Sequence, residues 1–300
     1  MEDMAQVADC DLPSLYLCAN HSSMNAQGTY LRIIKFGLLL QIAGVVISLY
    51  QPPAQNYKSA GPFFAALFFF ISLILTIVLK TKQYERIWYG GRAAAESVKT
   101  SAWRYSICSD PYSKDQEDQI VDETFIKNLK AILEQRGYLA DAISSEFPAG
   151  SQITEKMRTI RSLNTNDRLE VYMNQRIMDQ RNWYASKAKF NKKAADKLFA
   201  FFIVAQVFTT FFALLRIAMP YFLDLTGICA VIAASTLAWL QIKKHQELAQ
   251  SYAVTAHELG FVAEKGRHVK NDLDLANFVA DAEMAISREH TLWVARRESI

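Results

Sequence analysis

Residues 61–79, "GPFFAALFFFISLILTIVL", form an apolar stretch without a single charged residue. A helix needs about 20 apolar residues to cross the roughly 30 Å hydrocarbon core of a bilayer. A buried helix of a soluble bundle would instead carry a polar face that recurs every 3.6 residues. This stretch has no such face. It therefore predicts a transmembrane helix.

Three further stretches share this composition. They are "IIKFGLLLQIAGVVISLY" (33–50), "LFAFFIVAQVFTTFFALL" (198–215) and "YFLDLTGICAVIAASTLAWLQI" (221–242). The first of these stretches has one charge at its edge, Lys35. The regions 36–79 and 198–242 together hold only three charged residues, Lys58, Arg216 and Asp224. Short connections with proline, at 51–60 and 216–220, predict that each pair forms a tight antiparallel hairpin. The fold class is an all-α membrane protein with four spans.

Basic residues beside the spans predict their orientation, because loops rich in Lys and Arg stay in the cytoplasm. The cationic flanks contain Arg32, Lys35, Lys80, Lys82, Lys192, Lys193, Lys197, Lys243 and Lys244, whereas the opposite turns hold Lys58 and Arg216. We expect a multi-pass membrane protein, with both termini and the 80–196 segment in the cytoplasm. The polar, acidic N-terminus predicts no cleavable signal peptide.

The rest of the chain has helical patterns. We predict a stem over 80–107 that continues straight out of the second span, and a helix over 122–137 with Phe125 and Leu129 on its buried face. A helix over 152–196 leads into the third span. A second stem covers 243–268, and a final helix covers 271–297. These are long cytosolic extensions of the hairpins.

The pattern occurs twice. A shift of 162 residues places Lys82 on Lys244, Glu85 on Glu247, Ala94 on Ala256 and Glu96 on Glu258. We expect two repeats, 1–150 and 151–300, each with two spans and a stem. Because both hairpins enter from the same side, the repeat is parallel and lacks the inverted symmetry of many transporters.

Four segments carry a resemblance to a known family. They are "LPSLYLCANHSSMNAQGTYLR" and "WYGGRAAAESVKTSAWRY" around the first hairpin, and "RIMDQRNWYASKAKFNKKA" and "AISREHTLWVARR" in the second half. Through them the chain resembles a tandem member of the SLATT family, two-transmembrane-helix effector domains of bacterial conflict and anti-phage systems. The resemblance implies a pore-forming or membrane-disrupting effector that works in abortive infection. It also implies a nucleotide synthetase or nucleotide-binding sensor as a partner.

The first stem carries gating candidates. Trp88, Arg92, Glu96 and Trp103 lie mostly on one side of a helix, and Glu258 of the second stem is the counterpart of Glu96. These residues either sense a ligand, with arginine on phosphate and tryptophan on a base, or pack the stem on neighbouring helices. The small residues at 90–95 favour close helix packing.

Polar residues within the spans are candidates for lining a pore, because they are costly in hydrocarbon. They are Gln41, Ser48, Ser72, Thr76, Gln206, Thr209, Thr210 and Asp224. The alternative for each is helix–helix packing, and the two glutamines are the best pore candidates. Asp224 either forms an acidic ring at an outer pore mouth or pairs with Arg216.

Composition argues against other classes of function. The net charge is only +3, so direct binding of nucleic acid is not expected. The four cysteines form no CxxC pair. Cys10, Cys18 and His21 could be metal ligands, but their spacing fits no zinc module, and free thiols are the favoured interpretation. No HExxH motif is present. We expect no catalytic residue, no metal and no cofactor.

Two hypotheses remain for the function. The first is an oligomeric ion channel or membrane-disrupting effector that is gated through its cytosolic helices by a nucleotide signal or a partner protein. The second is a non-conducting membrane anchor that recruits a cytosolic defence enzyme. The expected partners are the lipid bilayer, further copies of the chain, and a nucleotide-sensing or defence-enzyme protein.

Overall fold

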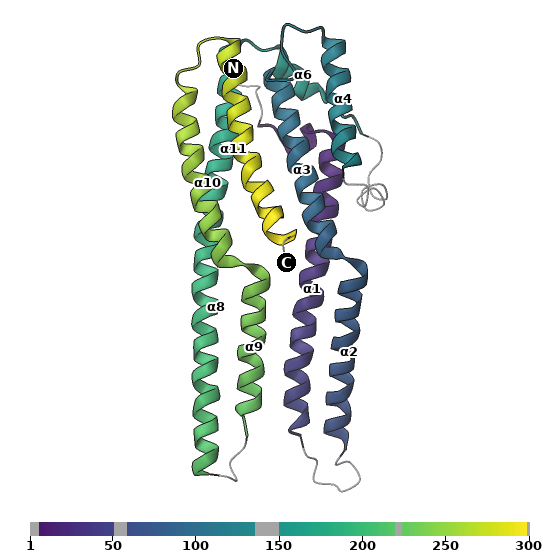
Figure 1. Ribbon diagram of the computed structural model, residues 1–300, viewed down its shortest axis with the longest axis vertical. Helices are drawn as coiled ribbons and strands as arrows, with labels where there is room; N and C mark the ends of the chain where they lie inside the picture. The colour runs from purple at the N-terminus through teal and green to yellow at the C-terminus, as the bar shows by residue number, and fades with distance from the viewer. Residues whose placement is uncertain (1–5, 51–58, 136–149, 220–223, 299–300) are drawn as a thin grey trace. The chain divides into compact units, whose positions relative to one another are not determined.

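The computed structural model describes residues 6–50, 59–135, 150–219 and 224–298, with side chains as far as Ser287. The described part is helical and contains no strand, as predicted (Figure 1). The chain divides into two compact units, each drawn from both halves of the sequence. The spanning unit comprises Gly28–Tyr84 and Ala188–Gln250, and the polar unit comprises Met1–Gln27, Glu85–Lys187 and Ser251–Ile300.

Four helical stretches are long and apolar enough to cross a membrane, which confirms the predicted number. Their spans belong to α1 (Ser14–Ser48), α2 (Ala60–Lys82), α8 (Asp179–Ala218) and α9 (Thr226–Lys243). Helix α1 begins far before the predicted span, and α8 begins 19 residues before its span. The predicted turn at 51–60 and the proline of the turn at 216–220 lie largely outside the described residues.

Close contact between α1 and α2 builds the first hairpin. A Cβ atom at Gly44 would lie 2.6 Å from Cε1 of Phe69. The Phe69 ring therefore occupies the space that a larger side chain at position 44 would need. The Ser72 hydroxyl lies 3.4 Å from the carbonyl oxygen of Gly37 and donates to it. Gly227 of α9 lies beside Val45, so the second hairpin also touches α1 within the spanning unit. Small residues let the helices approach, as expected where no hydrophobic effect drives their association.

The predicted continuous stems are wrong. Helix α2 ends at Lys82, and α3 (Tyr84–Ile107) begins after Gln83, whose φ is 48°. In the second half, α9 ends at Lys243, and α10 (His245–Gly266) begins after Lys244, whose φ is also 48°. Figure 1 shows both interruptions. The amides of Gln83 and Lys244 close the preceding helices by donating to Leu79 and Leu240.

The predicted helix over 152–196 is also interrupted. The chain forms α6 (Glu155–Ser162), α7 (Thr165–Tyr172) and a π-helical segment, η4 (Met173–Met178), before α8. The break has a local cause, because the side chain of Asn164 accepts a hydrogen bond from the Asp167 amide and caps α7. The predicted helices over 122–137 and 271–297 are found as α4 (Asp118–Glu134) and α11 (Asp272–Glu298). The predicted stop at Gly137 and the break at Pro148 lie outside the described residues.

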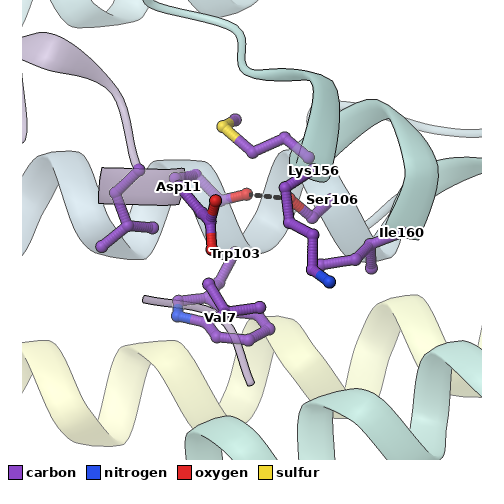
Figure 2. Close-up of a pocket in the computed structure, with 9 residues that line it drawn as sticks. Val7, Asp11, Trp103, Ser106, Lys156 and Ile160 are labelled. Atoms are coloured by element: carbon purple, nitrogen blue, oxygen red, sulfur yellow. Dashed lines mark hydrogen bonds between the residues drawn. The ribbon is translucent and has the colours of Figure 1, made fainter. Parts of the chain in front are cut away.

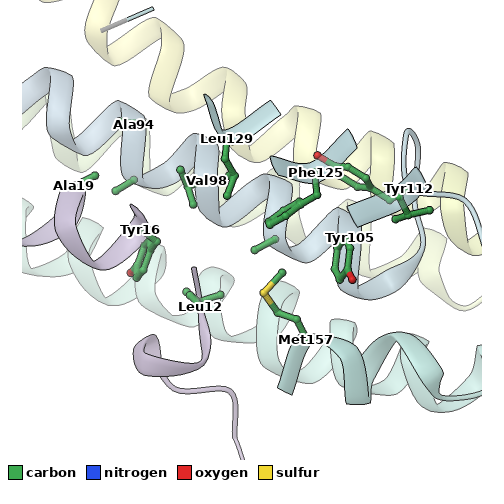
Figure 3. Packing of buried hydrophobic residues seen from close by; sticks show 13 residues of the cluster. Leu12, Tyr16, Ala19, Ala94, Val98, Tyr105, Tyr112, Phe125, Leu129 and Met157 are labelled. Carbon is green, nitrogen blue, oxygen red and sulfur yellow. The ribbon is translucent and has the colours of Figure 1, made fainter. Parts of the chain in front are cut away.

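Two apolar clusters form the core of the polar unit. Figure 3 shows the first, in which Tyr16 and Ala19 of α1, Val98 of α3, Phe125 of α4 and Met157 of α6 meet. The predicted buried face of α4 is thereby confirmed. In the second cluster, Trp103 of α3 packs with residues of α7, α10 and α11. The second cluster therefore combines segments from both halves of the sequence.

Candidate functional site

The surface of the spanning unit is apolar. Its exposed side chains include Phe63, Val207 and Leu214, each more than 60% exposed. An apolar surface of this extent is stable in lipid but not in water. It identifies the faces that the two hairpins present to the membrane or to neighbouring chains.

Two of the pore candidates carry amides. Gln41 on α1 and Gln206 on α8 are both exposed, and neither side chain has a hydrogen-bond partner among the described residues. The structure therefore places these pore candidates away from the contacts within the unit. A carboxamide carries two donors and one acceptor that hydrocarbon cannot satisfy.

The hydroxyl candidates behave differently. Thr76, Thr209 and Thr210 donate to backbone carbonyls four residues earlier, at 2.9–3.1 Å, and Ser48 donates to Val45 at 2.7 Å. Ser72 is buried against α1. These contacts satisfy the hydroxyl protons without water or a second chain. They give the hydroxyl groups a structural role.

Asp224 pairs with Arg216, the second of the two alternatives considered for it. The other carboxylate oxygen accepts a hydrogen bond from the amide of Thr226, the first residue of α9, at 3.1 Å. A carboxylate that is engaged on both oxygens is poorly placed to act as an isolated acidic ring. The interaction instead joins the end of α8 to the start of α9.

The gating candidates on α3 are part of the packed interior. Trp88 and Trp103 are buried, and the Arg92 and Glu96 side chains form an ion pair of 2.6 Å, as their spacing predicts. A Cβ atom at Gly91 would lie 3.1 Å from the carbonyl oxygen of Ala19, which confirms close packing of α3 on α1. Glu258 on α10 is half-buried and lies in no ion pair within the described residues.

A buried charged network that sequence analysis missed lies beside this stem. The Arg176 guanidinium in η4 donates twice to the Glu283 carboxylate in α11, at 2.8 Å each, and both side chains are at most 1% exposed. The same carboxylate accepts hydrogen bonds from Tyr172 at 3.0 Å and from Thr100 of α3 at 2.8 Å. Burial and the Glu283 charge raise the pKa of Tyr172 well above its usual value. One carboxylate thus joins three segments of the polar unit.

Lys99 adds a further charge near the network. Its ammonium lies 5.5 Å from the centre of the Tyr16 ring, and it has no carboxylate within 4 Å among the described residues. Burial lowers the pKa of Lys99, and the nearby charge of Arg176 lowers it further. An acidic residue inside an apolar stretch, such as Glu283 between Ala282 and Met284, is the only sequence signal that could have indicated this network.

Two further buried arginines secure the end of α3. Arg161 donates to the carbonyl oxygens of Tyr105 and Tyr112, at 3.1 and 2.9 Å, and Arg168 donates to that of Ile107 at 2.8 Å. The last carbonyls of a helix lack partners within the helix and carry partial negative charge. A guanidinium group donates hydrogen bonds to these carbonyl oxygens, and its positive charge offsets their partial negative charge. The arginines fix the stem at the end that lies farthest from the spans along the sequence.

The polar unit contains a small cavity beside Trp103, with a volume of about 10 Å³ (Figure 2). Val7, Ser106, Lys156 and Ile160 also line it. A space of this size holds one water molecule at most, whereas sites for small-molecule ligands occupy hundreds of cubic ångströms. The cavity is not a nucleotide site. No cluster of His, Cys, Asp or Glu that could hold a metal occurs in the described ranges, where Cys10 and Cys18 are free.

The helices and their apolar surface define an all-α membrane protein built from two hairpins and a packed polar unit. Residues 13–169 match the model of SMODS and SLOG-associating 2TM effector domain 3 (SLATT_3), and residues 172–293 match that of domain 1 (SLATT_1). The chain belongs to the SLATT family of two-transmembrane-helix effector domains and carries two of them in tandem. Neither the curated proteins nor the solved structures that were compared with the chain gave a match.

Proposed function

We propose that the chain is an oligomeric pore-forming or membrane-disrupting effector of a bacterial anti-phage system. The observation that carries this proposal is the exposure of Gln41 and Gln206 on the surface of the spans. The effector domains that the two halves match agree with it. The function is not enzymatic.

The cost of the two amides in lipid favours an assembly. Transfer of an amide without hydrogen bonds into hydrocarbon costs about 4–8 kcal/mol. A single chain in a bilayer would leave both amides facing lipid. In an oligomer they can bond to a neighbouring chain or line a water-filled conduit, and either arrangement removes the cost. Four helices are also too few to enclose a conduit alone, because they fill their own core.

We further propose that the polar unit controls opening in response to a nucleotide signal or a partner protein. The interruptions at Gln83 and Lys244, which we call the two joints, replace the continuous stems as the places where opening would be controlled. Both occur where a span ends, and both have the same backbone conformation. Because the cavity beside Trp103 is too small for a nucleotide, a nucleotide signal would need another surface or a separate sensor protein.

The location and orientation belong to the same proposal. Basic residues flank both hairpins at the ends that join the polar unit in the sequence. The positive-inside rule supports a cytoplasmic position for both termini. We propose that the spans lie in the bacterial inner membrane.

Conductance in a planar bilayer tests the pore. Purified wild-type chain should give discrete currents, and the double variant Gln41→Leu/Gln206→Leu should change their amplitude or abolish them. The matched control is Thr76→Val/Thr210→Val, which also alters one exposed polar residue in each hairpin but removes hydroxyls that already bond their own helices. The control should conduct as the wild type does.

Silence from a correctly assembled wild-type oligomer, with and without nucleotides, would count against the pore. It would favour a non-conducting anchor that recruits a defence enzyme. Equal currents from the wild type and the glutamine variant would show that these two amides do not line the conduit.

A further inference from the structure

Helix α8 presents a row of lysines directly before its span. Lys189, Lys192, Lys193 and Lys197, which we call the lysine face, occur within nine residues and are all exposed. Within the described ranges, no carboxylate lies within 4 Å of any of their ammonium groups, although Asp196 stands among them. The segment therefore carries a net charge of +3 that the protein leaves without an ion pair.

The four lysines share one side of the helix. At 3.6 residues per turn, they fall within an arc of roughly 140°. The opposite side at the same level is occupied, because Asn191 is buried and its side-chain oxygen lies 2.7 Å from Nδ1 of His245. Phe190, at the edge of the lysine face, is 63% exposed. The face is thus a cationic surface with an exposed aromatic ring beside it.

The depth of this surface in the membrane follows from the continuity of α8. The helix runs unbroken into the apolar stretch that begins at Leu198. At a rise of 1.5 Å per residue, the Cα atoms of Lys192 and Lys197 lie roughly 9 and 1.5 Å before Leu198. The polar layer on each side of a bilayer is about 5–7 Å thick, and lysine side chains extend along a helix to reach it. Lys243 and Trp239, whose ring centre lies 5.8 Å from the Lys243 ammonium, form an interfacial pair at the end of α9.

We propose that the lysine face binds the headgroups of anionic phospholipids. Clusters of lysines beside a span attract such lipids, and each lysine near the surface strengthens binding by about fivefold. The first hairpin differs, since its four cations at this level are divided between α1 (Arg32 and Lys35) and α2 (Lys80 and Lys82). The second hairpin would therefore carry the stronger lipid site, whether or not the chain conducts.

Native mass spectrometry of the detergent-solubilised full chain tests this inference. The titrated lipids are phosphatidylglycerol and, as the neutral comparison, phosphatidylcholine. The variant Lys192→Gln/Lys193→Gln/Lys197→Gln should weaken phosphatidylglycerol binding by about 100-fold, which is three factors of five. The matched control, Lys35→Gln/Lys80→Gln/Lys82→Gln, removes the same charge from the first hairpin and should weaken binding less than fivefold. Binding of phosphatidylcholine should not change in either variant.

Equal losses in the two triple variants would overturn the proposal, because they would show a general charge effect. An unchanged affinity in the α8 variant would overturn it as well. Inorganic phosphate at the concentration of the lipid should fail to displace phosphatidylglycerol, and displacement would mean that the face binds free anions rather than lipids. An unchanged far-ultraviolet circular dichroism spectrum confirms that each variant is folded.

Discussion

Glycine at both joints, Gln83→Gly/Lys244→Gly, should hold α2 and α9 in their interrupted form. A residue with a Cβ atom pays about 1–2 kcal/mol for the left-handed conformation that both positions adopt, and glycine does not. Glycine also destabilises a continuous helix by about 0.5–1 kcal/mol. Each substitution therefore favours the interrupted form over a continuous helix by about 1.5–3 kcal/mol, and the pair by about 3–6 kcal/mol if the sites are independent.

Single-channel recording measures the effect. If opening or closing requires both joints to become helical, transitions between open and closed should become at least 100-fold rarer, because about 1.4 kcal/mol corresponds to a factor of ten. The current through an open channel should stay the same. The control Thr81→Gly/Gln246→Gly places glycine two residues from each joint, at helical positions. It destabilises the helices as glycine does, but it leaves the left-handed residues Gln83 and Lys244 unchanged.

Transitions at the wild-type frequency in the joint variant would refute this reasoning. The two joints would then be fixed bends that packing imposes. Equal slowing in the joint variant and in the control would also refute it, since the left-handed conformation would have no part in the effect.

Two further predictions concern the stability of the polar unit. Glu283→Gln should lower the free energy of unfolding by about 3–5 kcal/mol, because it leaves Arg176 buried without its counter-ion. In thermal unfolding, the double variant Arg176→Met/Glu283→Leu should recover much of this loss. A double variant less stable than Glu283→Gln would contradict this. Asp272 accepts a hydrogen bond from Thr165 and faces Arg168 and Lys114, and these contacts lower its pKa. Its contribution is present above the unfolded pKa of about 3.9 and is lost as the pH falls through the lower folded value. The difference in melting temperature between the wild type and Asp272→Asn should therefore be constant above about pH 5 and vanish in stronger acid; a difference that persists there would exclude this origin.

Composition was sufficient to predict the spans, because a run such as 61–79 has no stable alternative to crossing a membrane. It could not predict the joints. The residues from Lys80 to Arg86 include neither proline nor glycine, so local propensity favours an unbroken helix, and tertiary structure overrides it. The sequence analysis also missed the cap at Asn164, because the helical pattern over 152–196 continues on both sides of it.

The buried network was beyond prediction for a different reason. Arg176 and Glu283 are 107 positions apart, and a single sequence does not show which charges meet. The i,i+4 pair of Arg92 and Glu96 was predictable because helix geometry alone sets its distance. The exposure of Gln41 and Gln206 also required the structure, since hydropathy does not distinguish the inner face of a hairpin from the outer one.

The composition of the polar unit has a consequence for how the protein can be divided. Trp103, from the first half, stacks edge-to-face on Tyr172, from the second, and Thr100 bonds to Glu283. The two family matches describe halves of a polypeptide, yet the second apolar cluster combines Trp103 and Ile107 of the first match with residues of the second. If the two halves were expressed as separate fragments, each would expose apolar surface that the other half normally covers. The two fragments would have to associate before either was soluble or inserted correctly. The tandem chain thus resembles a heterodimer whose two subunits are fused. Each half meets the other because both belong to one polypeptide, and not through a diffusional encounter.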